Sequence, residues 1–173
     1  AIWWMRNISR KDSKSLNKLF DMLTERGRQE DLESAVAVIK SLAEGGDGAA
    51  MWRLSCAYRS GAGTVKDINK ADIWMRRAAH KGHGTAANTL FDILWEKGTA
   101  RDLEEAVSVI RMLAEKGNTK SMERLSRAYR EGKGVEMNLD RASEWMRKAA
   151  DKNVAWAKNE LFDMQKIKGG VDD

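Results

Sequence analysis

The tripeptide Leu-Phe-Asp occurs three times, at residues 19–21, 90–92 and 161–163, and each copy lies 71 residues after the one before. Much of the sequence between the copies also repeats without a gap, and Tyr58-Arg59 with Gly61 and Gly63 returns as Tyr129-Arg130 with Gly132 and Gly134. Such a repeat is typical of a stacked array, in which each unit buries its apolar face only against its neighbours. The pattern favours a protein that presents a surface over one that runs a reaction.

The composition limits the classes of partner. The 173 residues include no proline, which suits a chain that is almost entirely helical. The net charge is +5, but basic and acidic residues are interspersed, so the sequence lacks the basic stripe of a specific nucleic-acid-binding protein. No apolar run approaches the length of a membrane span, and the single Cys56 excludes an intrachain disulfide.

The beginning of the chain carries no targeting segment. Ile2-Trp3 aligns with Ile73-Trp74, in the middle of a repeat, so we interpret the sequence as a piece of a longer protein. The compartment therefore stays open between the bacterial cytoplasm and periplasm.

Each 71-residue unit is predicted to form two helix-turn-helix hairpins. Ala50, Leu54 and Tyr58 share one helical face, and Gly61-Ala62-Gly63 then ends the helix, because glycine reaches left-handed backbone angles at little cost. We expect Asp67 and Asn138 to cap the second helices of two hairpins, and Asp31 and Asp102 to cap those of the others. The predicted array covers 1–173, with a partial helix at 1–10, hairpins at about 12–46, 47–82, 84–117 and 118–152, and a final helix at 154–168.

The stretches 50–82 and 125–150 resemble Sel1-like repeats, the longer-turn relatives of the tetratricopeptide repeat. Both carry Leu-Ser-x2-Tyr-x2-Gly-x-Gly and then Ala-x2-Trp with an alanine pair, although serine stands at 55 and 126 where glycine is usual. The alternating halves, 12–46 and 84–117, lack the Gly-x-Gly turn and the tryptophan. The resemblance implies an all-α, right-handed α-solenoid of about five helix-turn-helix hairpins, whose first helices line a concave surface, and it implies adaptor or scaffold work.

Three features could carry chemistry, and each has a simpler explanation. A phosphate loop needs a preceding strand, but the pattern predicts a helix before Gly61-x-Gly63. His80 and His83 have zinc-ligand spacing without the further ligands that zinc needs. Cys56 has no base indicated beside it. We therefore predict no enzyme activity, no catalytic residue, no metal and no cofactor.

The seven tryptophans fall into two groups. Trp3, Trp74 and Trp145 recur at one position, and Trp4 aligns with methionines, so these four are predicted to pack. Trp52, Trp95 and Trp156 stand where other copies have Glu, Thr or Lys, and we expect them to be exposed.

The resemblance also predicts which residues line the concave groove. In each first helix these are the residues two before and two after the core leucine, and the one after the tyrosine position. They are Asn17, Asp21 and Thr24; Trp52, Cys56 and Arg59; Asn88, Asp92 and Trp95; Glu123, Arg127 and Arg130; and Asn159 and Asp163, with Trp156 one turn earlier. Trp52, Trp95, Asn88 and Asp92 are the leading predicted contacts, because aromatic anchors in a polar surround are typical of peptide-binding sites.

Several interpretations stay open. Each Asn-xxx-Asp pair shares a helix face, so it can offer an amide and a carboxylate to a ligand, or bond the neighbouring hairpin. The predicted function is non-catalytic binding of a protein or peptide segment, with Arg59, Arg127 and Arg130 favouring an acidic stretch. The alternatives are an accessory array of a larger bacterial enzyme, in polysaccharide or cell-envelope biosynthesis, and direct carbohydrate binding by Trp with Asp and Asn.

Overall fold

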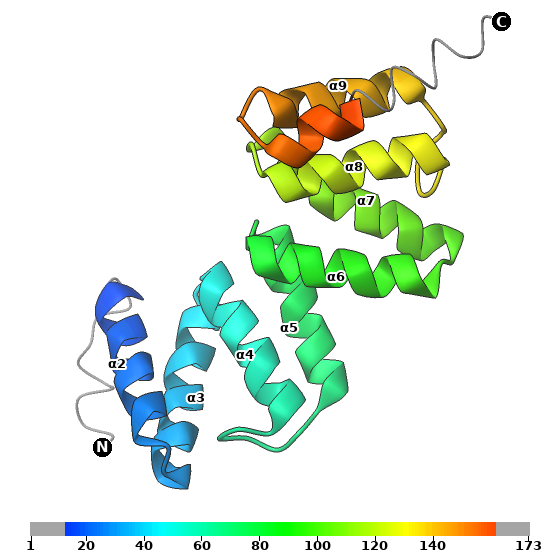
Figure 1. Ribbon diagram of the computed structural model, residues 1–173. Coiled ribbons are helices and arrows are strands. Elements are labelled where there is room, and N and C mark those ends of the chain that lie inside the picture. Colours follow the sequence, from blue (N-terminus) through cyan, green and yellow to red (C-terminus); the bar gives the residue numbers. More distant parts are fainter. Residues whose placement is uncertain (1–12, 162–173) are drawn as a thin grey trace, which may run out of the picture. The chain divides into compact units, whose positions relative to one another are not determined.

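The computed structural model describes residues 13–161, with side chains from residue 18 onward. Every regular element within this range is a helix (Figure 1). The helices are α2 (Ser13–Arg26), α3 (Gln29–Glu44), α4 (Gly48–Ser60), α5 (Ile68–His80), α6 (Gly84–Lys97), α7 (Ala100–Glu115), α8 (Thr119–Glu131) and α9 (Leu139–Ala150). A further helical segment occupies 155–161. The partial helix predicted at 1–10, including Trp3 and Trp4, and the end of the predicted final helix lie outside the described residues.

The chain divides into two compact units, residues 1–87 and 88–173. In the first unit, α2 pairs with α3, α4 pairs with α5, and α3 packs against α4. In the second unit, α8 pairs with α9, and α7 packs against α8. The second helix of one hairpin thus packs against the first helix of the next, as a stacked array requires.

Side-chain caps begin most of the second helices of the hairpins. Asp67 Oδ1 accepts from the backbone N–H of Lys70 at 2.9 Å, and Asn138 Oδ1 accepts from that of Arg141 at 2.9 Å, so both expected caps are confirmed. The caps expected at Asp31 and Asp102 are wrong, because α3 and α7 begin two residues before each aspartate.

Thr99 is the cap of α7 instead. Its hydroxyl accepts from the backbone N–H of Asp102 at 3.2 Å and donates to the Asp102 carboxylate at 2.7 Å. The residue before α3, Arg28, makes no side-chain cap, and it donates to the carboxylate of Asp31 at 2.7 Å. The two aspartates therefore lie in the first turns of their helices, where a negative charge interacts favourably with the positive end of the helix dipole.

The two glycines of each Gly-x-Gly turn have different roles. Gly61 and Gly132 end α4 and α8 in the left-handed conformation, with φ of +82° and +65°. Gly63 lies against the backbone carbonyl of Leu32 in α3, and Gly134 lies against that of Leu103 in α7, so closely that a Cβ at either position would clash. The second glycine therefore lets the turn contact the preceding hairpin.

Small buried residues bring the helices of each hairpin together. Ala71, Ala78 and Ala79 of α5 are fully buried, as are Ala142 and Ala149 of α9. Ser126 is buried in α8, and its hydroxyl donates to the carbonyl of Ala142 in α9 at 2.8 Å. The serine that replaces the usual glycine thus adds a hydrogen bond between the paired helices.

Candidate partner-binding site

The largest cleft described in the second unit lies among the first helices of its hairpins. It has a volume of about 840 Å³ and is lined by side chains of α6, of α8 and of the segment 155–161, with Met146 of α9. Six of the predicted groove residues line it: Asp92, Trp95, Glu123, Arg127, Arg130 and Trp156. The structure therefore brings these six side chains to one concave surface.

Trp95 is part of the packing of this cleft. Its ring stacks on that of Phe91, with 4.9 Å between the centroids, and the charged groups of Arg127 and Lys133 lie 5.3 and 5.5 Å from its centroid. Trp95 is half-buried, and so is Trp52, so the expectation that both are exposed is wrong. Each indole is partly covered by a neighbouring ring, that of Phe91 for Trp95 and that of His83 for Trp52. Trp156 has 37% of its surface exposed, as the sequence predicts.

The cleft is rich in ion pairs. Glu131 pairs with Arg127 at 2.7 Å and with Lys133 at 2.9 Å, and Arg130 pairs with Glu160 of the next first helix. Burial acts to raise the pKa of Glu131, but the hydrogen bonds and charges of Arg127 and Lys133 together bring that pKa below its usual value. Glu131 is therefore ionised at neutral pH, and the predicted contacts Arg127 and Arg130 already have carboxylate partners.

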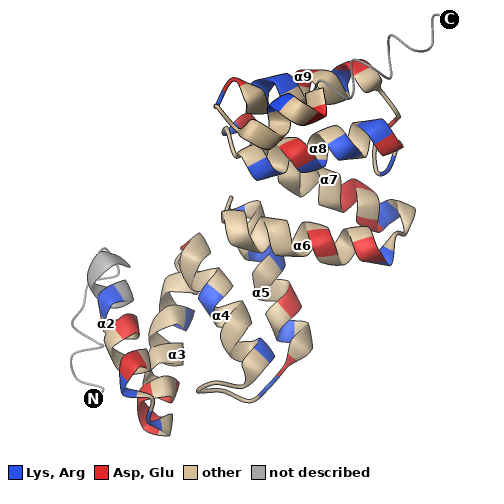
Figure 2. Ribbon diagram, in the orientation of Figure 1, with Lys and Arg blue, Asp and Glu red and all other residues tan. Residues whose placement is uncertain are grey.

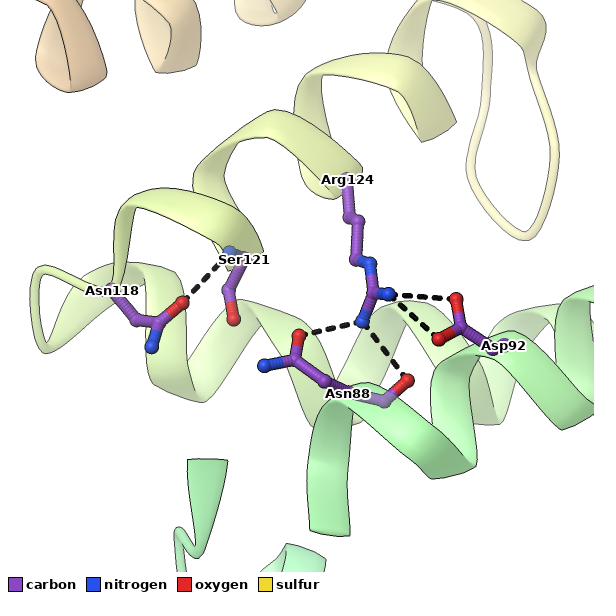
Figure 3. A network of polar contacts seen from close by, with 5 residues as sticks. All are labelled: Asn88, Asp92, Asn118, Ser121 and Arg124. Atoms are coloured by element: carbon purple, nitrogen blue, oxygen red, sulfur yellow. Dashed lines mark hydrogen bonds and ion pairs between the residues drawn. The ribbon is translucent and has the colours of Figure 1, made fainter. Parts of the chain in front are cut away.

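The Asn-xxx-Asp pair of α6 binds an arginine of the next hairpin (Figure 3). Arg124 of α8 donates to the carbonyl oxygen and Oδ1 of Asn88, at 2.9 and 2.6 Å, and to both carboxylate oxygens of Asp92, at 2.7 and 2.8 Å. Its guanidinium also lies 4.9 Å from the centroid of Phe91. Asn118 caps α8 by accepting from the backbone N–H of Ser121 at 2.9 Å. The Asn-xxx-Asp pair was expected either to bind a ligand or to bond the neighbouring hairpin, and the geometry of Asn88 and Asp92 matches the bond between hairpins.

The first unit repeats this contact. Arg53 of α4 lies 4.8 Å from the centroid of Phe20 and 3.3 Å from Asp21. We call the contact of Arg53 or Arg124 with the Phe-Asp of a Leu-Phe-Asp copy the arginine clamp. Sequence reasoning missed both arginines, although their spacing of 71 residues was a usable signal. The side chain of Asn17 and the whole of Asp163 lie outside the described part of the chain, while Asn159 is exposed on the segment 155–161.

A smaller pocket lies among α2, α3 and α4 of the first unit. It has a volume of about 320 Å³, and Phe20, Trp52 and Cys56 are among the residues that line it. Burial raises the pKa of the Cys56 thiol, and the charge of Arg59 partly opposes this rise. Within the described residues, no carboxylate lies at ion-pair distance from Arg59, whose Nη2 is 3.7 Å from Met75 Sδ.

His83 caps a helix. Its Nδ1 accepts from the backbone N–H of Ala86 at 3.2 Å, and its ring stacks on Trp52 with 5.8 Å between the centroids. Burial lowers the pKa of His83, and the charge of Arg53 adds to this effect while that of Asp47 opposes it. No group of three potential metal-binding side chains occurs in the part of the chain that the structure describes. Among the helices of that same part, none has the length and apolarity needed to cross a membrane.

Paired helices, stacked hairpins and Gly-x-Gly turns define an all-α repeat protein of the α-solenoid class. The family model of the Sel1 repeat matches residues 48–83 and 119–154. The chain is similar to a Sel1 repeat protein from Oxalobacter formigenes, with 32% identity over 72% of this chain and 95% of that one, and a TM-score of 0.62. The chain belongs to the Sel1 repeat family, which confirms the resemblance and the fold class predicted from the sequence.

A second solved structure is also similar. It is c5321, a protective antigen present in uropathogenic Escherichia coli strains that displays an SLR fold, with 28% identity and a TM-score of 0.61. The match covers 84% of this chain but only 35% of c5321, so this chain spans about a third of that protein. No curated protein matches the chain.

Proposed function

We propose that the chain is a non-catalytic scaffold that binds a protein or peptide segment along the first helices of its hairpins. Arrays of Sel1 repeats generally serve protein interactions, and the helical array of this chain fits that role. The observation that carries the proposal is the cleft of about 840 Å³ in the second unit, where an exposed indole lies among charged side chains. Aromatic anchors within a polar rim are typical of hot spots in protein interfaces.

The charges of this cleft favour a partner that carries both signs. The lining includes the basic residues Lys120, Arg124, Arg127 and Arg130 and the acidic residues Asp92, Glu96, Glu123, Glu131 and Glu160. Three of the four basic residues already pair with carboxylates of the chain. An acidic segment would therefore gain little at this cleft, while a segment with basic and acidic side chains could pair with both.

The groove residues divide into two roles in this proposal. Trp156, Lys120 and Glu123 contact the partner, because they lie at the surface of the cleft, and Asn159 lies on the same helical segment as Trp156. Asn88 and Asp92 hold α8 through Arg124, and Trp95 supports the wall of the cleft with Phe91. Trp52 and Arg59 belong to the first unit, where they contribute to a separate surface.

The test is site-specific photo-crosslinking of the full chain in extract of the source cells. A photoreactive amino acid replaces Glu123 in one variant and Glu144, an exposed residue of the second helix α9, in a control variant. We expect a specific crosslinked protein from position 123 alone, and we expect Trp156→Ala to remove it while the thermal stability stays unchanged. Equal crosslinking from both positions, or a product insensitive to Trp156→Ala, would contradict the proposal.

A further inference from the structure

The pocket of the first unit aligns with one part of the cleft of the second unit, where the indole of Trp95 takes up part of the equivalent space. Three residues that line the pocket, Phe20, Cys56 and Ala62, align with Phe91, Arg127 and Lys133. In the second unit those three side chains surround the indole of Trp95 at 4.9 to 5.5 Å. The residue that aligns with Trp95 is Thr24, which also lines the pocket. The first unit therefore has an opening where the second has an indole.

The two copies of the repeat also differ in a carboxylate that pairs with an arginine of the first helix. Arg59 aligns with Arg130, which pairs with Glu160, but the residue that aligns with Glu160 is Thr89. Arg59 is exposed on α4, one turn beyond Cys56, and no described carboxylate lies at ion-pair distance from it. At the aligned positions the sequence thus keeps the arginine of this pair and has a threonine in place of the acid.

We propose that the pocket of the first unit takes an aromatic side chain of a partner protein, and that a neighbouring carboxylate of this partner pairs with Arg59. The second unit supplies the equivalent ring and carboxylate from its own sequence, as Trp95 and Glu160. This inference rests on the binding function proposed above and names the chemistry of the partner at a separate surface.

The lining of the pocket favours a neutral, flat side chain. Arg53 is the one charged residue among the lining residues described, and its guanidinium lies over Phe20 and near Asp21. A charged side chain in this space would lose hydration without a new partner. An aromatic ring would instead bury apolar surface against Phe20, Leu32, Ala35 and Val36.

The reactivity of Cys56 can report whether the pocket is occupied, because Cys56 is the only cysteine of the chain and lines the pocket. The probe is the blocked peptide acetyl-Gly-Trp-Glu-Gly-amide, and the controls replace its Trp with Ala or its Glu with Gln. We measure the rate at which iodoacetamide modifies Cys56, and we measure peptide binding by saturation-transfer NMR. The Trp-Glu peptide is expected to slow the modification. Removal of the ring should weaken binding at least about tenfold, and removal of the acid about two- to fivefold.

Two variants that fill the pocket test whether the peptide binds there, and two further variants test the role of Arg59. Thr24→Trp places in the first unit the residue that the second unit has, so it should slow the modification of Cys56 and abolish binding of the Trp-Glu peptide. Cys56→Trp, which places an indole in the pocket from the side of α4, should also abolish binding and serves if Thr24→Trp does not fold. Arg59→Gln should keep binding of the ring but remove the preference for Glu over Gln, whereas Lys40→Gln, an exposed change on α3, should alter neither.

Three results would overturn the inference. The first is binding of the peptide without protection of Cys56, and the second is unchanged binding to Thr24→Trp and to Cys56→Trp. The third is faster modification of Cys56 in a Trp3→Ala/Trp4→Ala variant without peptide, which would assign the pocket to the chain's own first residues. Failure here leaves crosslinking from position 123 unaffected, because these variants change no residue of the second unit.

Discussion

Helices α4 and α8 occupy the same position in the two copies of the repeat and both carry a clamp arginine, yet they differ in their other charges and in the space beside that arginine. α4 carries two arginines and no acidic residue, while α8 carries charges of both signs along its length (Figure 2). Arg124 of α8 makes four hydrogen bonds to α6, and the indole of Trp95 takes up part of the cleft that both residues line. The equivalent space beside α4 is an open pocket.

The two units share the glycines and buried alanines that their turns and helix packing require, and they differ in side chains at the surface. Both have a left-handed glycine at the end of the first helix, a second glycine against the preceding hairpin, and buried alanines between paired helices. Positions 24, 56 and 60 are Thr, Cys and Ser in one copy and become Trp, Arg and Glu in the other. The frame is thus constant, and the side chains that differ are those that line the cleft of one unit and the pocket of the other.

The largest expected effect falls on the shared frame. Gly63→Ala and Gly134→Ala should each lower the free energy of unfolding by about 2–4 kcal/mol, because a left-handed backbone and a clash with a carbonyl combine. Gly27→Ala and Gly98→Ala are matched controls with positive φ and no close contact, and each should cost about 1 kcal/mol. Urea unfolding followed by circular dichroism measures all four. Equal losses at Gly63 and Gly27 would show that the turn does not contact the preceding hairpin closely.

Removal of the arginine clamp should cost more stability in the second unit than in the first. Arg124→Met leaves the oxygens of Asn88 and Asp92 without their donor, and we expect it to cost about 2–3 kcal/mol. The side chain of Arg124 is 12% exposed, while that of Arg53 is 32% exposed and 3.3 Å from Asp21. Arg53→Met should therefore cost less, about 1 kcal/mol or below.

Hydrogen exchange followed by mass spectrometry locates each loss of stability. Arg124→Met should speed exchange in α6 and α8, while Arg53→Met should act on α2 and α4. Equal costs for the two substitutions would mean that the clamp contributes the same in both units, whatever its geometry.

The sequence predicted the frame well, because the frame depends on local chemistry that repeats. Glycine at a helix end and apolar residues on one face indicate the same structure wherever they occur, so the family and the fold class were accessible from residues such as Gly61 and Leu54. The caps at Asp31 and Asp102 were mispredicted for a related reason. An aspartate is favourable both at the cap and in the first turn, and the apolar pattern does not distinguish these positions.

The groove was harder to predict, because exposure there depends on neighbours from other helices. A tryptophan at a position that is Thr or Glu elsewhere was expected to be exposed, but Phe91 and His83 provide rings that cover Trp95 and Trp52. The pairing of Arg130 with Glu160 joins residues 30 positions apart, and no single-helix pattern contains it. The arginine clamp could have been found, since Arg53 and Arg124 recur with the Leu-Phe-Asp copies.

Trp95→Thr should make the second unit resemble the first. The substitution removes a half-buried ring from its stack on Phe91 and should cost about 1–2 kcal/mol, since only part of the indole surface is buried. Trp156→Thr is the matched control, because this ring is exposed and its loss should change stability by less than about 0.5 kcal/mol. Thermal unfolding measures both. A cost at Trp156 as large as at Trp95 would mean that the second unit depends on both indoles for its packing.

The smallest expected effect is a pH dependence confined to the first unit. Burial lowers the pKa of His83 in the folded chain, and Nδ1 must be neutral to accept the N–H of Ala86. The stabilisation is therefore present above the unfolded pKa of histidine, and it is lost as the pH falls toward the lower folded pKa. Acidification from pH 7.5 to 5 should lower the Tm of the parent more than that of His83→Asn, which keeps a capping side chain without this titration. Parallel Tm profiles for the two proteins would show that His83 contributes no pH-dependent stability.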